Sequence, residues 1–257
     1  MTTRAWSIIA FTVASVALAF LLPAMPQPVD YHDFADDRHL AGVANFLDVV
    51  SNGAFVLAGV AGIIVTLYPR TSFEFARERV PYLVFFLGVV LTGLGSGYYH
   101  LDPDNETLFW DRLPMTIAFM SLISAQIVDR ISIRAGLALL LPLLLVGMGS
   151  VVYWILTERA GTGNVMPYGV LQFYSVVMLL VLALLYPSRY SRGADIYWVF
   201  AAYVVAKILE TFDREILALG NLMSGHSLKH VAAAVGSVLV MRMLWLRRLQ
   251  RQAGAVR

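Results

Sequence analysis

The chain has 257 residues, of which 59% are hydrophobic and 14% charged, and its formal net charge is +2. This composition is too apolar for an ordinary soluble domain and indicates a polytopic membrane protein. The absence of cysteine excludes disulfides, a catalytic thiol and thiolate metal ligands.

Eight apolar runs are long enough, or nearly long enough, to cross a bilayer as helices. They cover residues 6–22, 45–67, 80–100, 112–128, 134–156, 167–186, 195–213 and 226–246. Short polar turns separate the runs, without a linker, a low-complexity segment or an internal repeat. We therefore predict an all-α, polytopic membrane helical bundle that forms a single integral-membrane domain over residues 1–257.

The arginines predict the orientation of this bundle, because positive residues close to membrane helices favour the cytoplasmic side. One side carries both chain ends and alternate turns, with Arg4, Arg70, Arg77, Arg79, Arg130, Arg134, Arg189, Arg192, Arg247, Arg248, Arg251 and Arg257. The other side carries two acidic stretches and only Arg38, Arg112, Arg159 and Arg214 in its turns. Both termini are therefore expected in the cytoplasm. The first run also resembles a cleavable signal peptide, and the orientation of the other seven runs is the same in either case.

Three histidines are expected at the outer ends of these runs. His226 and His230 open the last run, and their spacing of four residues places both rings on one helix face. His100 ends the third run at the same predicted depth. In a chain without cysteine, a soft metal depends on imidazole and carboxylate ligands. Three histidines with a fourth position open are typical of a catalytic zinc site.

Two further polar residues share this depth. Asp111 opens the fourth run, and Ser96 precedes His100 by one helical turn. Ionisable groups within a membrane are costly and tend to line functional cavities. The alternative is that each residue is an ordinary cap or interfacial hydrogen-bonding group. For Ser96, this would be a bond to a carbonyl one turn earlier in its helix.

The ordered polar residues resemble the alkaline ceramidase family. The motifs that carry the resemblance are Gly95-Ser96-x-x-x-His100, Asp111-x-Leu113-Pro114-Met115 and His226-x-x-x-His230. The resemblance extends from about Tyr31 to Met243 and implies a seven-helix hydrolase core over residues 31–246, with residues 1–25 as an extra N-terminal helix. The extra helix departs from the seven-span core of the family and suggests a bacterial-type member in the inner membrane. The predicted orientation places its active site toward the outer, periplasmic side.

The resemblance also implies a reaction, namely hydrolysis of the amide bond of ceramide or a related N-acyl lipid to a free fatty acid and a sphingoid-type amine. His100, His226 and His230 would ligate zinc and leave the fourth position for water. Asp111 would act as general base, and Ser96 would hydrogen-bond the developing oxyanion. The expected partners are the lipid substrate and the membrane, without nucleic acid or an obligatory protein partner.

An acidic segment over Tyr31–His39, called the outer segment below, precedes the second run at the place where the family binds calcium. By resemblance, Asp33, the backbone oxygen of Phe34, Asp36 and the side chain of Asn45 are candidate calcium ligands, and oxygen ligands suit such a hard cation. The sequence departs from the family at Asn45, where eukaryotic members have a glutamate. The alternative is a solvated acidic turn.

The remaining histidines of this segment, His32 and His39, are expected to be surface or turn residues rather than ligands.

The seventh run carries four charged residues, Lys207, Glu210, Asp213 and Arg214, spaced three and four apart. Such spacing predicts pairing along one helix face, which reduces the cost of burying the charges in a membrane. Asp213 also resembles an acidic residue of the family, which implies a role in orienting a zinc-bound histidine.

Two other functional classes stay open at this point. A zinc-containing receptor or sensor of the adiponectin-receptor-like type would carry the same residues, with a mainly structural metal. A transporter would be expected to show paired discontinuous helices or repeat symmetry, and neither is visible.

Overall fold

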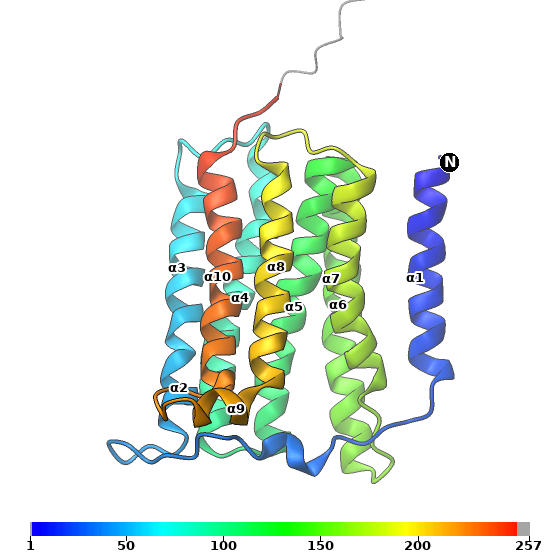
Figure 1. Cartoon of the computed structure of the whole chain (residues 1–257). Coiled ribbons are helices and arrows are strands. Elements are labelled where there is room, and N and C mark those ends of the chain that lie inside the picture. Colours follow the sequence, from blue (N-terminus) through cyan, green and yellow to red (C-terminus); the bar gives the residue numbers. More distant parts are fainter. Residues whose placement is uncertain (1, 251–257) are drawn as a thin grey trace, which may run out of the picture.

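The computed structural model describes residues 2–250, so the predicted cytoplasmic Arg251 and Arg257 lie outside the described residues. Within that range, the chain is a bundle of helices without a β-strand (Figure 1). The long helices are α1 (Thr3–Leu21), α3 (Gly53–Leu67), α4 (Arg79–Leu101), α5 (Asn105–Arg130), α6 (Ile133–Arg159), α7 (Met166–Leu185), α8 (Ile196–Thr211) and α10 (Gly225–Leu246). The short elements are α2 (Phe46–Ser51), α9 (Asp213–Ala218) and 3-10 turns over Val29–His32, Ala76–Glu78 and Gly193–Asp195. The prediction of an all-α bundle is confirmed.

Six helical stretches of the described chain are long and apolar enough to cross a membrane. They are α1, α2 with α3, α4 with the turn before it, α6, α7 and α10. These stretches fit an integral, multi-pass membrane protein. Helix α5 carries charged residues in its first turns, and α8 has only 16 residues. Both nevertheless run alongside the other helices of the bundle (Figure 1).

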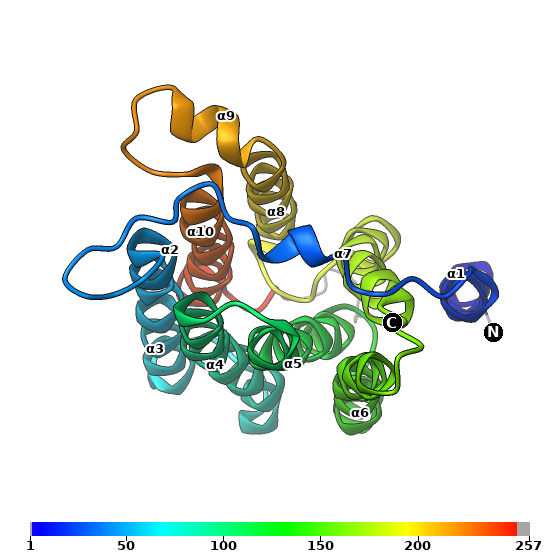
Figure 2. The ribbon, with the colours of Figure 1, turned by 90° about the horizontal axis from the view of Figure 1, so that it is seen from below.

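The main core lies between α4, α5, α7 and α10. Its fully buried members include Phe86, Met120, Leu182 and Leu244. The extra N-terminal helix α1 lies at the edge of the bundle, beside α7 (Figure 2). It contacts α7 through Phe11 and Tyr174, whose stacked rings have centroids 5.5 Å apart. Only Ala19 of α1 is buried, so this helix adds little to the core.

Three helix boundaries differ from those predicted. The second run is two helices, because the chain turns at Asn52 between α2 and α3. The fourth run begins at Asn105, where Asp104 accepts a hydrogen bond from the Thr107 N–H at 2.7 Å and caps the helix. The seventh run ends at Thr211, since Phe212 leaves the helical conformation before α9 begins.

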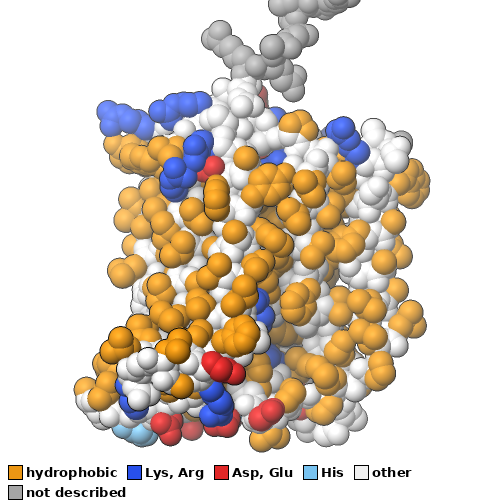
Figure 3. Space-filling model, viewed as in Figure 1, with side chains coloured by type: hydrophobic (Ala, Val, Ile, Leu, Met, Phe, Trp, Pro, Cys, Tyr) orange, Lys and Arg blue, Asp and Glu red, His pale blue; other side chains and the backbone are white. Residues whose placement is uncertain are grey.

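Basic side chains gather at the end of the bundle where α1 begins, whereas acidic side chains gather mainly at the opposite end (Figure 3). At the basic end, Arg247 is 1% exposed and donates to Asp129 Oδ2 at 2.8 Å. Its guanidinium also lies over the rings of Phe73 and Tyr190. The distribution of charge follows the predicted asymmetry, and the assignment of the basic end to the cytoplasm stays a prediction.

Candidate metal centre and active site

Three buried histidines meet where α4 ends and α10 begins. The ring centroids of His100, His226 and His230 lie 4.9 to 5.0 Å apart. One nitrogen from each ring lies within 4.8 Å of the other two. Within residues 2–250, this is the one group of three or more potential metal-ligating side chains. The structure therefore brings together the three residues that the sequence pattern selected.

The start of α10 holds two of these rings in place. Ser224 caps the helix by accepting a hydrogen bond from the Ser227 N–H at 3.0 Å. Gly225 allows α10 to approach α8, because a Cβ at this position would lie 2.1 Å from the carbonyl oxygen of Leu209. Asp213 Oδ1 accepts a hydrogen bond from the His226 backbone N–H at 2.7 Å. Asp213 thus holds the backbone of His226 at the start of α10, and its role in orienting a zinc-bound histidine stays a prediction.

The protonation of His230 is set by a partner on α2. Its Nδ1 lies 2.8 Å from Ser51 Oγ, and that hydroxyl donates to the Asp48 carbonyl oxygen at 3.1 Å. Because the hydroxyl proton is engaged, the Ser51 oxygen accepts a hydrogen bond from the Nδ1–H group of His230, and this tautomer leaves Nε2 with a free lone pair. His100 Nδ1 is buried without a hydrogen-bond partner in the protein. These donors fit a zinc ion, which three imidazoles and an open position commonly bind.

Lys229 approaches the third ring. Its ammonium lies 2.8 Å from Nε2 of His226 and donates to Glu210 Oε1 at 3.2 Å. An ammonium has no lone pair, so His226 Nε2 is the acceptor and is unprotonated. A metal requires the same unprotonated nitrogen, so an ion bound through Nε2 would take the place of the Lys229 ammonium.

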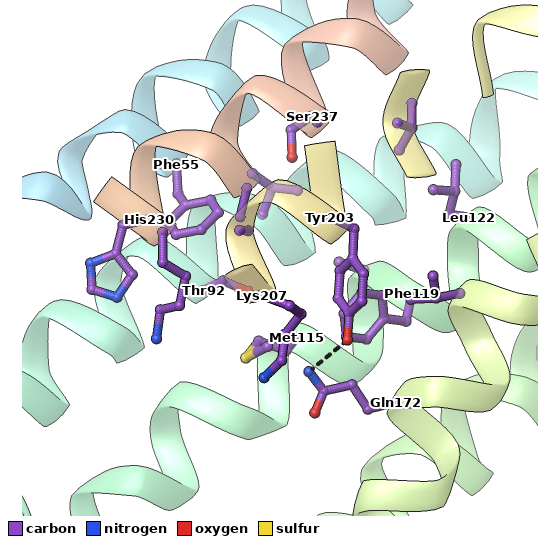
Figure 4. Close-up of a pocket in the computed structure, with 18 of the residues that line it drawn as sticks. Phe55, Thr92, Met115, Phe119, Leu122, Gln172, Tyr203, Lys207, His230 and Ser237 are labelled. Atoms are coloured by element: carbon purple, nitrogen blue, oxygen red, sulfur yellow. Dashed lines mark hydrogen bonds between the residues drawn. The ribbon is translucent and has the colours of Figure 1, made fainter. Parts of the chain in front are cut away.

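Ser96 and Asp111 line a cavity of about 200 Å³ together with His230. Gly95 permits this arrangement, because a Cβ there would lie 1.9 Å from the carbonyl oxygen of Trp110. Helices α4 and α5 can therefore approach closely at the residues that carry Ser96 and Asp111. The cavity continues between apolar side chains of α4, α5, α7 and α8, including Phe85, Val89, Leu122, Leu179 and Val199. Figure 4 shows His230, Met115 and Lys207 among the residues that line it.

The comparison with family models agrees with this geometry. The ceramidase family model matches residues 36–255 of the chain. The chain belongs to the ceramidase family. A search of the curated proteins found no match.

In this ceramidase-family protein, the outer segment covers two of the three histidines through Phe34. The Phe34 ring lies 4.6 Å from the rings of both His100 and His226, measured between centroids. The Asn45 side chain donates to the His100 carbonyl oxygen at 2.9 Å. Asn45 thereby satisfies a carbonyl at the end of α4, which its own helix leaves free.

The carboxylates proposed for calcium have arginine partners in the structure. Asp33 pairs with Arg214 at 2.6 Å, and Asp36 pairs with Arg38 at 2.6 Å. The hydrogen bond from Arg38 lowers the pKa of Asp36 below its ordinary value. Calcium binding by this segment stays a prediction, and it requires both carboxylates to exchange their arginine partners for the cation.

The two other histidines, His32 and His39, are not part of the cluster formed by His100, His226 and His230. His39 is exposed. His32 lies in a 3-10 turn, where its Nδ1 is 2.9 Å from Tyr99 Oη and its Nε2 is 3.1 Å from Asn105 Oδ1. Partial burial lowers the pKa of His32 below its ordinary value. His32 therefore ties the outer segment to the ends of α4 and α5.

The predicted pairing of four charged residues along one helix face was wrong. Lys207 and Glu210 pair within α8, but α8 ends before Asp213 and Arg214. These two residues belong to α9, where Arg214 pairs with Asp33. The bend at Phe212 thus separates Lys207 and Glu210, which line the cavity, from Arg214, which pairs with the outer segment.

Sequence reasoning missed the environment of Arg112, which was assigned to an outer turn. Arg112 is 4% exposed, and its guanidinium lies 4.4 Å from the Trp154 ring and 4.8 Å from the Tyr168 ring. A third ring, that of Tyr31, lies 5.1 Å away. Cation–π attraction to three rings offsets part of the cost of burying this charge beside Asp111.

Proposed function

We propose that this protein is a zinc-dependent membrane amidase, which hydrolyses the amide bond of ceramide or a related N-acyl lipid to a free fatty acid and a sphingoid-type amine. The observation that carries the proposal is that Ser96, Asp111 and His230 line the same largely apolar cavity. A lipid amide has the matching structure, since one polar, reactive group is attached to long apolar chains.

In the proposed site, His100, His226 and His230 hold the zinc. When bound, zinc supplies a Lewis acid that activates water and polarises the amide carbonyl. The Ser51 contact with His230 keeps a ring nitrogen free for the metal. Burial of all three rings excludes bulk water from their ligand atoms.

Asp111 and Ser96 perform the proton transfer and the charge stabilisation in this proposal. The oxygen of water bonds to the acyl carbon while Asp111 accepts the proton from water. The carbon–nitrogen bond then breaks, and Asp111 returns the proton to the leaving amine. The Ser96 hydroxyl donates a hydrogen bond to the carbonyl oxygen as negative charge develops there.

The proposed setting is a bacterial inner membrane, with the site toward the periplasm and both termini in the cytoplasm. The site lies where α4 ends and α10 begins (Figure 1), at the end of the bundle opposite the one where basic side chains gather (Figure 3), which supports this orientation. The substrate would then enter from the outer leaflet.

The test is release of fatty acid from a short-chain ceramide by the purified protein, together with elemental analysis of the same preparation. We expect about one zinc per chain, loss of turnover after metal removal, and recovery on adding zinc. The His230→Ala variant is the control for hydrolysis by contaminants. A folded, zinc-containing protein that cleaves no N-acyl lipid would contradict the amidase and favour a receptor or sensor with a structural metal.

A further inference from the structure

The cavity that contains the reacting groups runs along the helices rather than across them. On α4 its lining residues are Phe85, Val89, Thr92 and Ser96, which recur every three or four positions and therefore share one helix face. The lining residues of α5 and α7 are spaced in a similar way. The cavity thus follows the helix axes from the reacting groups toward the basic end of the bundle.

Three helices agree on the length of this cavity. On each of them the outermost and innermost lining residues lie 11 positions apart, namely Ser96 and Phe85 on α4, Asp111 and Leu122 on α5, and Tyr168 and Leu179 on α7. At a rise of about 1.5 Å per residue, this separation corresponds to about 16 Å along the bundle. An extended saturated chain advances about 1.25 Å per carbon, so a chain of about 14 carbons spans the same distance.

The two ends of the cavity differ in polarity. The outer end carries Ser96, Asp111 and His230, whereas the inner end is lined by Leu122 and by Phe85, Leu179 and Ile196. Figure 4 shows His230 and Leu122 far apart among the labelled lining residues. Ser237 of α10 is a polar side chain at intermediate depth. A lipid amide therefore fits with its reactive group at the outer end and one alkyl chain directed inward.

A buried, hydrogen-bonded network closes the inner end. Tyr82 precedes Phe85 by three positions, is fully buried and donates to Asp129 Oδ2 at 2.7 Å. Gln126 follows Leu122 by four positions, and its amide donates to the Tyr82 hydroxyl at 3.3 Å. A longer alkyl chain would have to separate these polar groups without supplying new hydrogen bonds, which is costly. The cavity therefore ends near Phe85 and Leu122.

The second chain of a ceramide has a different place to lie. An apolar groove between α7 and α8 is lined by exposed side chains such as Phe173, Val204 and Ile208, and it shares Tyr203 and Lys207 with the cavity. The hydroxyl groups of a sphingoid base can form hydrogen bonds with Tyr203 and Lys207 where the two sites meet. Its alkyl chain can then continue into the groove, which leaves the deep cavity to the acyl chain.

We propose that the inner end of the cavity sets the length of the acyl chain, with Phe85, Leu122 and Leu179 as specificity-determining residues. The inference rests on the proposed function, because it assigns the acyl part of the amide to this cavity. The preferred substrates carry saturated acyl chains of about 14 carbons. Each further carbon up to this length buries more apolar surface, whereas a longer chain overpacks the closed end.

The first test uses ceramides that share one sphingoid base and carry saturated acyl chains from octanoyl to eicosanoyl. For the zinc-loaded wild type, kcat/KM should rise up to the myristoyl amide and then fall about 10-fold by the stearoyl amide, because overpacking is costly. In the control series the acyl chain stays lauroyl and the sphingoid chain is lengthened, which changes the solubility of the lipid in the same way. This series should show no such fall. A steady rise of kcat/KM through the eicosanoyl amide would contradict the inference.

The second test moves the closed end. Leu122→Ala should shift the optimum toward longer acyl chains by about two carbons, because it removes most of one side chain at that end. The matched control is Met120→Ala on the same helix. Met120 is also buried but packs toward α6, where a Cβ at Gly147 would lie 2.8 Å from its Cγ, so this variant should keep the optimum.

A variant of opposite effect keeps the test decisive if Leu122→Ala does not fold. Val199→Phe adds a ring to the inner wall of the cavity and should shift the optimum toward shorter acyl chains. An unchanged optimum in the folded cavity variants overturns the inference. An equal shift in Met120→Ala also overturns it, because the change would then not depend on the cavity.

A binding series separates this inference from the proposed function. Saturated fatty acids from decanoate to eicosanoate are titrated into the full-length wild type and Leu122→Ala, and thermal stability is recorded. A maximum near myristate that moves to longer acids in Leu122→Ala supports the inference even if no ceramide is cleaved. Ceramide hydrolysis that does not depend on acyl length overturns the inference while the amidase stands. An optimum in sphingoid length also overturns it, because the sphingoid chain would then occupy the cavity.

Discussion

Ser51 Oγ lies 2.8 Å from Nδ1 of His230 and joins the beginning of the bundle's second span to a histidine of its last. Replacing Ser51 with alanine should weaken zinc binding about 10- to 100-fold, because the partner that fixes the protonation of a ligating histidine is lost. Competition with a chromophoric chelator measures this. Ser175→Ala, which removes a hydroxyl bonded to the Leu171 carbonyl within α7, is the control and should bind zinc normally. Unchanged affinity in Ser51→Ala would show that the contact does not tune the metal.

The Asp111→Asn substitution tests whether Asp111 acts as a general base or as a ligand of the metal. An amide cannot accept the proton, so Asp111→Asn should keep its zinc and lose a factor of about 10²–10⁴ in turnover. His230→Ala should lose both zinc and turnover. Metal content and amide hydrolysis are measured on the same preparations. Normal hydrolysis by Asp111→Asn would refute the proposed mechanism, and loss of its zinc would make Asp111 a metal ligand.

Acidification should loosen the outer segment through His32. Its pKa is lowered in the folded protein, so the fold favours the neutral ring. The stabilisation is complete above the unfolded pKa of about 6.5 and declines as pH falls below it toward the lowered folded pKa. Proteolysis of the segment before α2 should therefore accelerate below about pH 6.5. His32→Gln should show a flatter pH dependence than the wild type, and identical pH profiles would exclude His32 as the cause.

The arginine distribution predicts topology. A reporter that functions only in the cytoplasm should be active when fused after Arg257, and one that functions only outside should be active near Asp104. The reverse pair of activities would place the metal centre on the cytoplasmic face. It would also remove the argument for substrate from the outer leaflet.

Hydropathy predicted most of the helices, and the i, i+4 spacing predicted that His226 and His230 share a helix face. Both signals are local, because they depend on neighbouring residues. His100 was added from the predicted depth at which its own helix ends. The break between α2 and α3 was not visible, because Ser51 and Asn52 interrupt an otherwise apolar run only slightly. Its significance depends on His230, which is remote in the sequence.

The charged residues were harder to place for a related reason. The burial of Arg112 depends on the rings of Trp154 and Tyr168, which come from two other helices. The separation of Asp213 from Lys207 depends on a bend at Phe212, for which the sequence has no proline or glycine as a signal. Charge spacing alone predicted a continuous helix. In the structure, α8 ends at Thr211, and Asp213 and Arg214 of α9 bond to α10 and to the outer segment.

The ring of Phe34 has a kinetic consequence for the metal. Because it lies against His100 and His226, an ion cannot leave along that side until the outer segment moves away. Loss of metal to an excess of chelator should then proceed at the rate at which this segment opens, independent of chelator concentration. Phe34→Ala should restore a dependence on that concentration. Retention of metal during brief dialysis would consequently report how slowly this segment opens, rather than how tightly the histidines bind the ion.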